Sequence, residues 1–326
     1  MIDFRYHLVS IVSIFLALAV GIVLGAGPLQ QGISTTVSQE LATLRQDKSD
    51  LRDQLDAQTQ AAQSRDSFIA AASPTLVAGQ LAGRTVALVA LPGADAATTK
   101  ATATILQQAG AVVASTTTIH QQWVATSTEA STARDQVAAD LATRLGTDSA
   151  TAGGSMIDAV LAQLLVKVPT TAPGGLGGGP DPAVVTQAVA DLTKADLLEV
   201  DVTSPSPAEL AVVIAANQQQ GSSDADKAAA DGYVSLVAAL DANSGGAVVA
   251  SDVGVTGSQN AVSVVTDLRQ NAEAVKAVSS VDDAGLPMGR ASIVFALTQQ
   301  LEGQAGQYGL QSGVTAAYPP LPTPTS

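Results

Sequence analysis

The chain has 326 residues and carries 15 Lys and Arg against 29 Asp and Glu, so its formal net charge is −14. A surface with this excess of acid lacks the basic stripe that nucleic-acid phosphates require, which excludes DNA or RNA as a main partner. Cysteine is absent, and this excludes disulfides, thiolate nucleophiles, zinc ribbons and iron–sulfur clusters.

The first element is a predicted transmembrane helix. Residues 8–27 hold no charged side chain, and at ~1.5 Å per residue they span about 30 Å, the thickness of the hydrocarbon core of a bilayer. The alternative is a cleaved signal peptide, whose apolar region usually covers about 7–15 residues. Pro28 follows Ala26 and Gly27 directly, where a signal peptidase needs an extended strand. We therefore interpret residues 1–28 as a cytoplasmic stub and a retained helix in membrane lipid.

The orientation of this helix follows from the flanking charges. Arg5 precedes the apolar segment, and the first basic residue after it is Arg45. The positive-inside rule then places the N-terminus in the cytoplasm and the bulk of the chain on the other side of the membrane. The sequence therefore predicts a single-pass membrane protein with an extracytoplasmic domain.

Small residues recur at every fourth position of the apolar segment, on one face of the helix. They are Ser13, Ala17, Gly21 and Gly25. The GxxxG pattern of the last two lets two helix backbones approach closely. Gly and Ala are common in membrane helices in any case, but four small residues in register favour self-association of the helix.

Residues 29–73 predict a coiled-coil stalk. Apolar positions alternate in spacing between four and three residues, which is the heptad seam of a coiled coil. The seam contains Val37, Leu41, Leu44, Lys48, Leu51 and Leu55. The alternative is one amphipathic helix that packs on its own domain. The 3.5-residue period favours a homo-oligomer, with a dimer as the first choice, and Pro74 predicts the end of the helix near Ser73.

Residues 80–310 predict an extracytoplasmic α/β domain. Apolar runs rich in β-branched residues indicate strands over 85–91, 111–119, 197–202, 210–215, 247–251 and 275–281. Helical patterns cover a segment that ends at Ala109-Gly110 and residues 128–145, 154–167, 184–192, 224–242, 262–268 and 291–302. This alternation predicts a Rossmann-like, doubly wound parallel or mixed sheet covered on both faces. Residues 311–326 are predicted to form a disordered Pro-rich tail.

Motifs that could bind a ligand are few in this domain. The loop after the first strand has one glycine, Gly93, where a dinucleotide fingerprint needs three. The loop with Asp252, Gly254 and Gly257 follows a strand and precedes a helix, so it lies where α/β sheets place ligands. Tight turning explains its glycines equally well. These four residues are the candidate ligand-loop positions.

No catalytic residue and no cofactor are predicted. His120 lies three residues before Trp123 and is expected to pack a loop rather than to act as a base. Asp282 and Asp283 are typical of a solvated turn. Nothing in the pattern indicates a reaction class, so the chain is not interpreted as an enzyme.

Two blocks of sequence near the ends of the chain carry a family resemblance. The first is MIDFRYHLVSIVSIFLALAVGIVLGAGPL, and the second runs from Val281-Asp282-Asp283 through Gly289-Arg290 and Leu297 to Gly303 and Gly306-Gln307-Tyr308-Gly309. Together with the order of anchor, coiled coil and α/β domain, they resemble the actinobacterial family of mycobacterial copper transport protein B (MctB), over about residues 1–310. The resemblance implies a role in copper export or resistance, with copper as the transported ion, for a pore protein described from the mycobacterial outer membrane.

The residues themselves offer little to copper. Copper(I) prefers thiolate, thioether and imidazole ligands. The chain provides Met1, Met156, Met288, His7 and His120, and no two of them have ligand spacing, so no metal site is predicted within one protomer. Long helical stretches and nine aromatic residues do not support an outer-membrane barrel.

Two functions remain as hypotheses. In the first, the protein is a membrane-anchored, self-associating cell-envelope protein with the copper-transport role that the resemblance implies. In the second, it is a non-enzymatic envelope scaffold or binding module, whose α/β domain engages an envelope partner or polymer.

Overall fold

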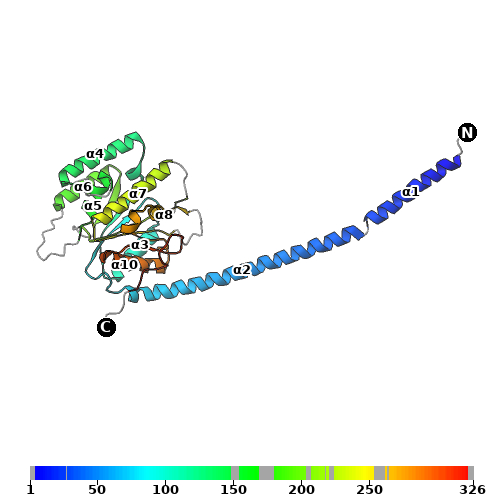
Figure 1. The fold of residues 1–326 in the computed structure, drawn as a ribbon, viewed down its shortest axis with the longest axis horizontal. Helices are drawn as coiled ribbons and strands as arrows, with labels where there is room; N and C mark the ends of the chain where they lie inside the picture. The colour runs from blue at the N-terminus through cyan, green and yellow to red at the C-terminus, as the bar shows by residue number, and fades with distance from the viewer. Residues whose placement is uncertain are drawn as a thin grey trace. The chain divides into compact units, whose positions relative to one another are not determined.

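A computed structural model describes residues 4–26, 28–147, 154–168, 180–202, 207–216, 218–219, 224–252, 261–262 and 264–321. The chain divides into two units, Met1–Arg65 and Asp66–Ser326 (Figure 1). The first unit is helical, and the second holds the α/β domain.

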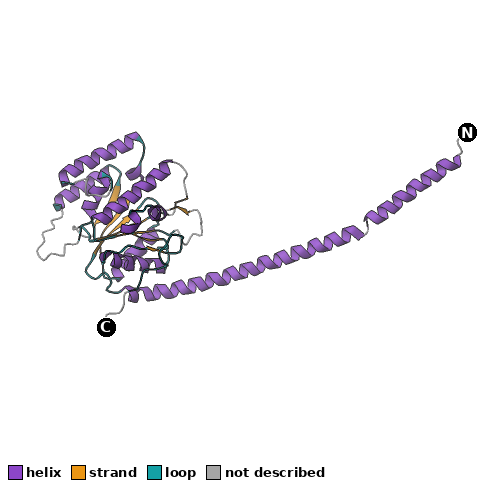
Figure 2. Ribbon diagram, in the orientation of Figure 1, coloured by secondary structure: helices purple, strands orange, loops and turns teal. Residues whose placement is uncertain are grey.

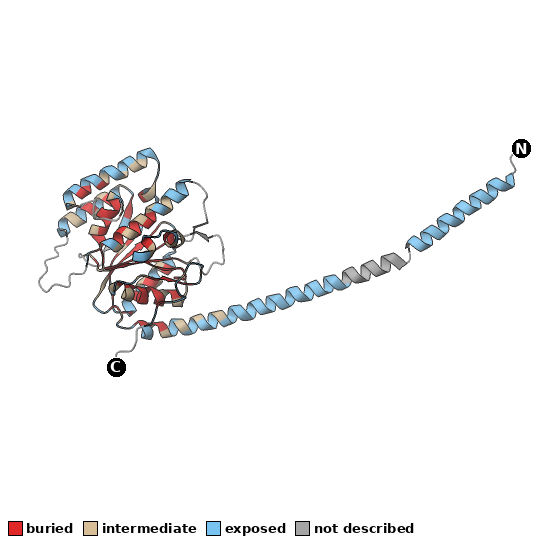
Figure 3. Ribbon diagram, in the orientation of Figure 1, coloured by how far each residue is buried: buried red, intermediate tan, exposed pale blue. Residues whose placement is uncertain are grey.

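Two helices form the described part of the first unit. Helix α1 covers Phe4–Ala26, and α2 begins at Pro28, runs through the rest of the unit and ends at Val77 in the second. Pro28 suits the first position of a helix because it needs no hydrogen-bonded N–H there. Within α1, Phe4–Gly25 is long and apolar enough to cross a membrane, and all of its side chains are exposed (Figure 3).

The end of α2 differs from the sequence prediction. The helix continues past Ser73 and contains Pro74 within its last turn. Proline removes one backbone hydrogen bond, which is a small loss so close to a helix end. The side chain of Val77 is fully buried in the core of the second unit together with Leu81, and this burial stabilises the additional turn.

The second unit is built on a seven-stranded sheet with the order β3-β2-β1-β4-β6-β8-β9 (Figure 2). The strands are β1 Thr85–Ala90, β2 Val112–Ile119, β3 Leu198–Val202, β4 Leu210–Ile214, β6 Ala247–Ala250, β8 Ser279–Val281 and β9 Gln307–Tyr308. Strand β3 pairs antiparallel with β2, and the other pairs are parallel. The short strands β5 Gln218–Gln219 and β7 Ala261–Val262 pair separately. The predicted doubly wound α/β class is confirmed.

Helices cover both faces of this sheet (Figure 1). They are α3 Ala96–Gln108, α4 Thr128–Leu145, α5 Met156–Leu165, α6 Pro182–Lys194, α7 Asp224–Ala242, α8 Val264–Gln270, α9 Ala274–Ala277 and α10 Pro287–Leu301, with a 3-10 turn η1 at Gln121–Val124. Alternate residues of β1 enter two separate cores. Ala87 and Val89 pack under α4 to α8, whereas Val86 and Leu88 pack under α3, α10 and the end of α2.

One predicted strand is shorter than the sequence indicates. Of residues 275–281, only Ser279–Val281 is a strand, because the preceding residues form α9. The Asn271 side chain accepts hydrogen bonds from the backbone N–H groups of Glu273 and Ala274, which starts that helical turn. The β-branched pattern predicted a strand here, but the hydrogen bonds of the Asn271 side chain favour a helical turn instead.

A buried ion pair joins the last strands to the domain. Arg269 Nη1 lies 2.6 Å from Asp282 Oδ2, and the side chains are 6% and 0% exposed. Arg269 also donates to the carbonyl of Tyr308, and Asp282 accepts the backbone N–H groups of Leu310 and Gln311. Gly309 has a φ of +129°, and a Cβ there would lie 2.1 Å from Asp282 Oδ1. The C-terminal block of the family resemblance is thus one hydrogen-bonded unit.

The chain after β9 returns to that strand. The backbone N–H of Thr315 donates to the carbonyl of Gln307 at 2.6 Å, and Pro319 is buried. Residues 322–326, the rest of the predicted tail, lie outside the described residues.

We predict that Asp282→Ala destabilises the domain by about 3–5 kcal/mol, because it leaves the Arg269 charge buried and unpaired. Urea unfolding of the full chain in detergent, followed by circular dichroism, measures the change. Glu273→Ala is the matched control, since Glu273 and Lys276 form an exposed pair, 86% and 68% exposed, whose loss costs about 0–1 kcal/mol. Equal losses in the two variants would contradict this role of Asp282.

Candidate functional site

The carboxyl ends of β1, β4, β6 and β8 meet at one edge of the sheet, where open α/β sheets place ligands. The connections turn in opposite directions from β1, so the switch point lies between β1 and β4. Gly93 lies in the loop after β1 with a φ of +79°, and a Cβ there would lie 3.2 Å from the Cβ of Ala216, beyond β4. Gly93 therefore allows a tight turn and the close approach of two loops.

Carboxylates from three strand ends lie near one another at this edge. Asp95 follows β1 and caps α3, since its Oδ2 accepts the N–H of Thr98 at 2.7 Å. Asp252 follows β6 and Asp283 follows β8. Burial raises the pKa of Asp252, and the negative charge of Asp95 raises it further, whereas the N–H of Gly285 and the Arg290 charge lower it. Carboxylates therefore gather at this edge of the sheet, and the chain has no cysteine thiol to place beside them.

Asp283 is the least compensated of these acids. Its side chain is fully buried, and neither carboxyl oxygen has a hydrogen-bond partner in the part of the chain that the structure describes. Burial raises the pKa of Asp283 to about 7, and the charges of Asp282 and Asp252 act in the same direction, against Arg269. The prediction that Asp282 and Asp283 form a solvated turn is wrong, because the parallel strand β8 carries both into the interior.

Two glycines make room for these carboxylates. A Cβ at Gly285 would lie 2.1 Å from Asp252 Oδ1, and a Cβ at Gly289 would lie 2.0 Å from the carbonyl oxygen of Asp283. A larger residue at either position would displace the acidic edge. Gly289 belongs to the block that carries the family resemblance. Its role at this edge is structural, because it leaves room for the backbone carbonyl of Asp283.

Possible metal ligands are dispersed in the described part of the chain. Among the described residues, no group of three or more His, Asp or Glu side chains could hold a metal ion. His120 Nδ1 lies 2.8 Å from Asp196 Oδ1, and Trp123 Nε1 donates to the buried Asp158 Oδ1 at 2.9 Å. Both aromatic side chains thus have hydrogen-bonding partners within the domain.

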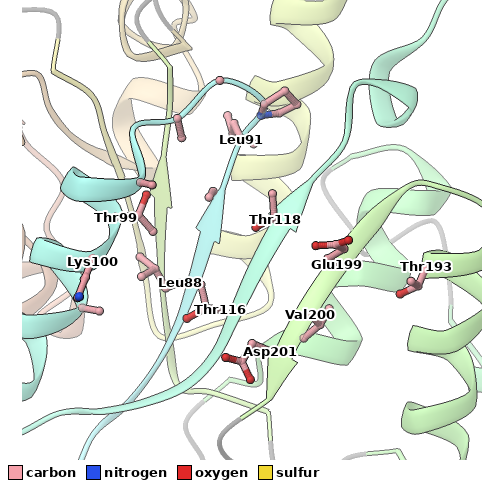
Figure 4. Close-up of a pocket in the computed structure, with 16 residues that line it drawn as sticks. Leu88, Leu91, Thr99, Lys100, Thr116, Thr118, Thr193, Glu199, Val200 and Asp201 are labelled. Atoms are coloured by element: carbon pink, nitrogen blue, oxygen red, sulfur yellow. The ribbon is translucent and has the colours of Figure 1, made fainter.

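A groove of about 810 Å³ opens on the face of the sheet near β3 (Figure 4). Its floor is formed by Leu88 of β1 with Thr116 and Thr118 of β2. Lys100 of α3 lies on one side, and acidic residues of β3 lie on the other. Gly93 is part of the rim.

The groove was missed from the sequence, except for Gly93. Its polar residues alternate along two strands, at 116 and 118 in β2 and at 199 and 201 in β3. Such alternation indicates one exposed face of a strand. It could have flagged each strand separately, but not the pairing of segments about 80 residues apart.

The other candidate positions are distributed as follows. Asp252 lies at the acidic edge, whereas Gly254 and Gly257 lie outside the described residues. The four small residues of α1 are exposed, and nothing lies within 4 Å of a Cβ added at Gly21 or Gly25. The seam residues of α2 that have described side chains, Leu41, Leu44, Lys48, Leu51 and Leu55, are also exposed, while the Val37 side chain is outside the description.

Titration of Asp283 should make the stability of the domain depend on pH. An acid whose pKa is raised by folding stabilises the fold below its unfolded pKa of about 3.9 and loses that contribution as the pH rises through about 7. Burial also raises the pKa of Asp241, to about 6. We therefore expect Asp283→Asn to flatten the fall in unfolding free energy between pH 6 and 7.

Urea unfolding at a series of pH values measures this effect. Asp140→Asn, on the exposed face of α4, is the control and should keep the wild-type profile. A fall between pH 6 and 7 that persists in Asp283→Asn would show that another group is responsible.

Comparison with known proteins identifies the family of the chain. The family described as "Copper transport outer membrane protein, MctB" matches residues 1–319. The proteins named "Copper transporter MctB" in Mycobacterium tuberculosis and Mycobacterium bovis are each 28% identical to the chain over 330 residues, which is 96% of this chain and 98% of each relative. The alignments therefore span the anchor, the long helix and the α/β domain alike. The chain belongs to the MctB family, as the resemblance predicts.

Proposed function

We propose that the protein is a membrane-anchored, self-associating and non-enzymatic component of the cell envelope that takes part in copper transport. Membership of the MctB family supports the copper role, because relatives that align with 96% of this chain are named copper transporters. Copper is the transported ion in this proposal and not a resident cofactor.

The proposed topology has the N-terminus in the cytoplasm and the α/β domain outside the cytoplasmic membrane. Phe4–Gly25 is long and apolar enough for one membrane crossing. Arg5 lies on the short side of this segment, which favours retention of that side in the cytoplasm. The positive-inside rule does not oppose export of the acidic domain, because few basic residues follow the helix closely.

The observation that carries the self-association is the exposed leucine seam of α2. Leu41, Leu44, Leu51 and Leu55 are 46–63% exposed. Full burial of a leucine side chain contributes about 1.5–3 kcal/mol, which a lone helix forgoes. A second copy of α2, packed knobs-into-holes along the same seam, would bury these leucines and leave Lys48 as a register-setting polar position. A parallel dimer is the simplest assembly.

Association of α1 would accompany association of α2. Ser13, Ala17, Gly21 and Gly25 offer a face on which two backbones can approach. Because the described residues contain one candidate membrane span, a path for copper through the bilayer would have to run between copies of α1. Ser10 and Ser13 are the polar side chains that the apolar segment 8–27 brings to such a path.

A scaffold or binding role is the second candidate function. The acidic edge and the groove near β3 are two features of the α/β domain that copper transport does not require. A domain that engages an envelope partner or polymer would use such features. Unchanged copper content in a deletion strain would favour this function over the first.

Deletion of the gene should raise cellular copper and copper sensitivity, and expression of the wild-type chain should restore both. We expect Leu51→Glu/Leu55→Glu not to restore them, because charges in the seam oppose helix association. Gln60→Glu, on the opposite face of α2, is the matched control and should restore both. Mass spectrometry of cellular copper measures these outcomes. An unchanged copper content in the deletion strain would contradict the copper role.

Self-association can be tested apart from copper, because the chain has no cysteine of its own. We expect Leu51→Cys to form a covalent dimer on mild oxidation in membranes, since seam positions of two helices face each other. Gln60→Cys should remain monomeric under the same conditions. Non-reducing gel electrophoresis is the measurement, and equal cross-linking at the two positions would contradict the proposed seam.

A further inference from the structure

The groove near β3 has a continuous row of side chains across three strands. Leu88 of β1 is the register partner of Thr116 in β2, which is in turn the partner of Asp201 in β3. One step along, Thr118 is the partner of Glu199. Register partners share a face of the sheet, so apolar, hydroxyl and acidic groups follow one another across the floor (Figure 4).

The polar side chains of the groove are available to a ligand. Lys100, Thr118, Glu199 and Asp201 are exposed, and Thr116 is partly exposed. None of these five side chains forms a hydrogen bond or an ion pair with the described part of the chain. As far as the described residues are concerned, their donors and acceptors are open to solvent.

The charges of the groove are separated by sign. Lys100 projects from α3 on one side, whereas Glu199 and Asp201 lie on β3 across the floor (Figure 4). A ligand that satisfies both sides must carry a cationic group and an anionic group at a distance from each other. Between them it must offer amide-like hydrogen-bonding groups to the threonines and small apolar groups to the exposed Ala96 and the half-buried Ala103 of α3.

From this arrangement we propose that the groove binds a short zwitterionic peptide with small side chains. The peptide ammonium lies at Glu199 and Asp201, and its terminal carboxylate lies at Lys100. Thr116 and Thr118 hydrogen-bond to the peptide backbone. A volume of about 810 Å³ is within the range of about 300–1,000 Å³ that small-ligand sites occupy. This site does not depend on the proposed copper role.

Other ligand classes fit the groove less well. The two carboxylates repel phosphate groups, and one lysine cannot offset them, which disfavours nucleotides. None of the described residues that line the groove is aromatic, so they offer a sugar ring no stacking surface. Calcium takes about six to eight oxygen ligands, and the two carboxylates supply only part of such a shell.

Calorimetric titration of the full chain in nanodiscs with tetra-alanine tests the proposal. We expect saturable binding that weakens at least tenfold in Glu199→Gln/Asp201→Asn and also in Lys100→Gln, because charge-assisted hydrogen bonds are lost. Glu129→Gln, an exposed position at the start of α4, is the control and should bind like the wild type.

Capped probes assign the two ends of the peptide. N-acetylation should weaken binding to the wild type but have no further effect in Glu199→Gln/Asp201→Asn, and C-terminal amidation should behave in the same way towards Lys100→Gln. The proposal is overturned if tetra-alanine does not bind, if the doubly capped peptide binds equally well, or if a neutral tetrasaccharide binds in its place.

Discussion

The buried pair of Arg269 and Asp282 is the interaction on which the acidic edge of the domain depends. It joins α8, β8 and the segment after β9, and the carboxylate also receives the N–H groups of Leu310 and Gln311. Because the arginine neutralises Asp282, β8 can end inside the protein. Asp283, the residue after Asp282, is then held at the carboxyl edge of the sheet, and its carboxylate has no hydrogen-bond partner among the described residues.

The domain has two chemically different regions on the same sheet. At the carboxyl edge, burial and mutual repulsion favour protonated acids, and Gly285 and Gly289 bring them close to the backbone. In the groove near β3, the carboxylates of Glu199 and Asp201 are exposed to solvent. Only the second region combines free charges with an open cavity, so it is the better binding surface.

The anchor and stalk follow different physical rules from this domain. Their described side chains are mostly exposed, and in the proposed function lipid and a second copy of the chain would bury them. The apolar length of α1 suits lipid, and the leucine seam of α2 suits a second copy. In the proposed function, copper passes between assembled copies of α1, because the described residues include one candidate membrane span.

Local sequence determined much of this protein, while long-range pairing decided the rest. Hydrophobic periodicity was sufficient for the anchor, for the helices at 128–145 and 224–242, and for the α/β class, because it records which face of a segment is buried. It misjudged Asp283, whose burial depends on the sheet around it. It also could not place Thr116 beside Asp201, because their contact arises from β-strand register across a separation of about 80 residues, which only the folded sheet sets.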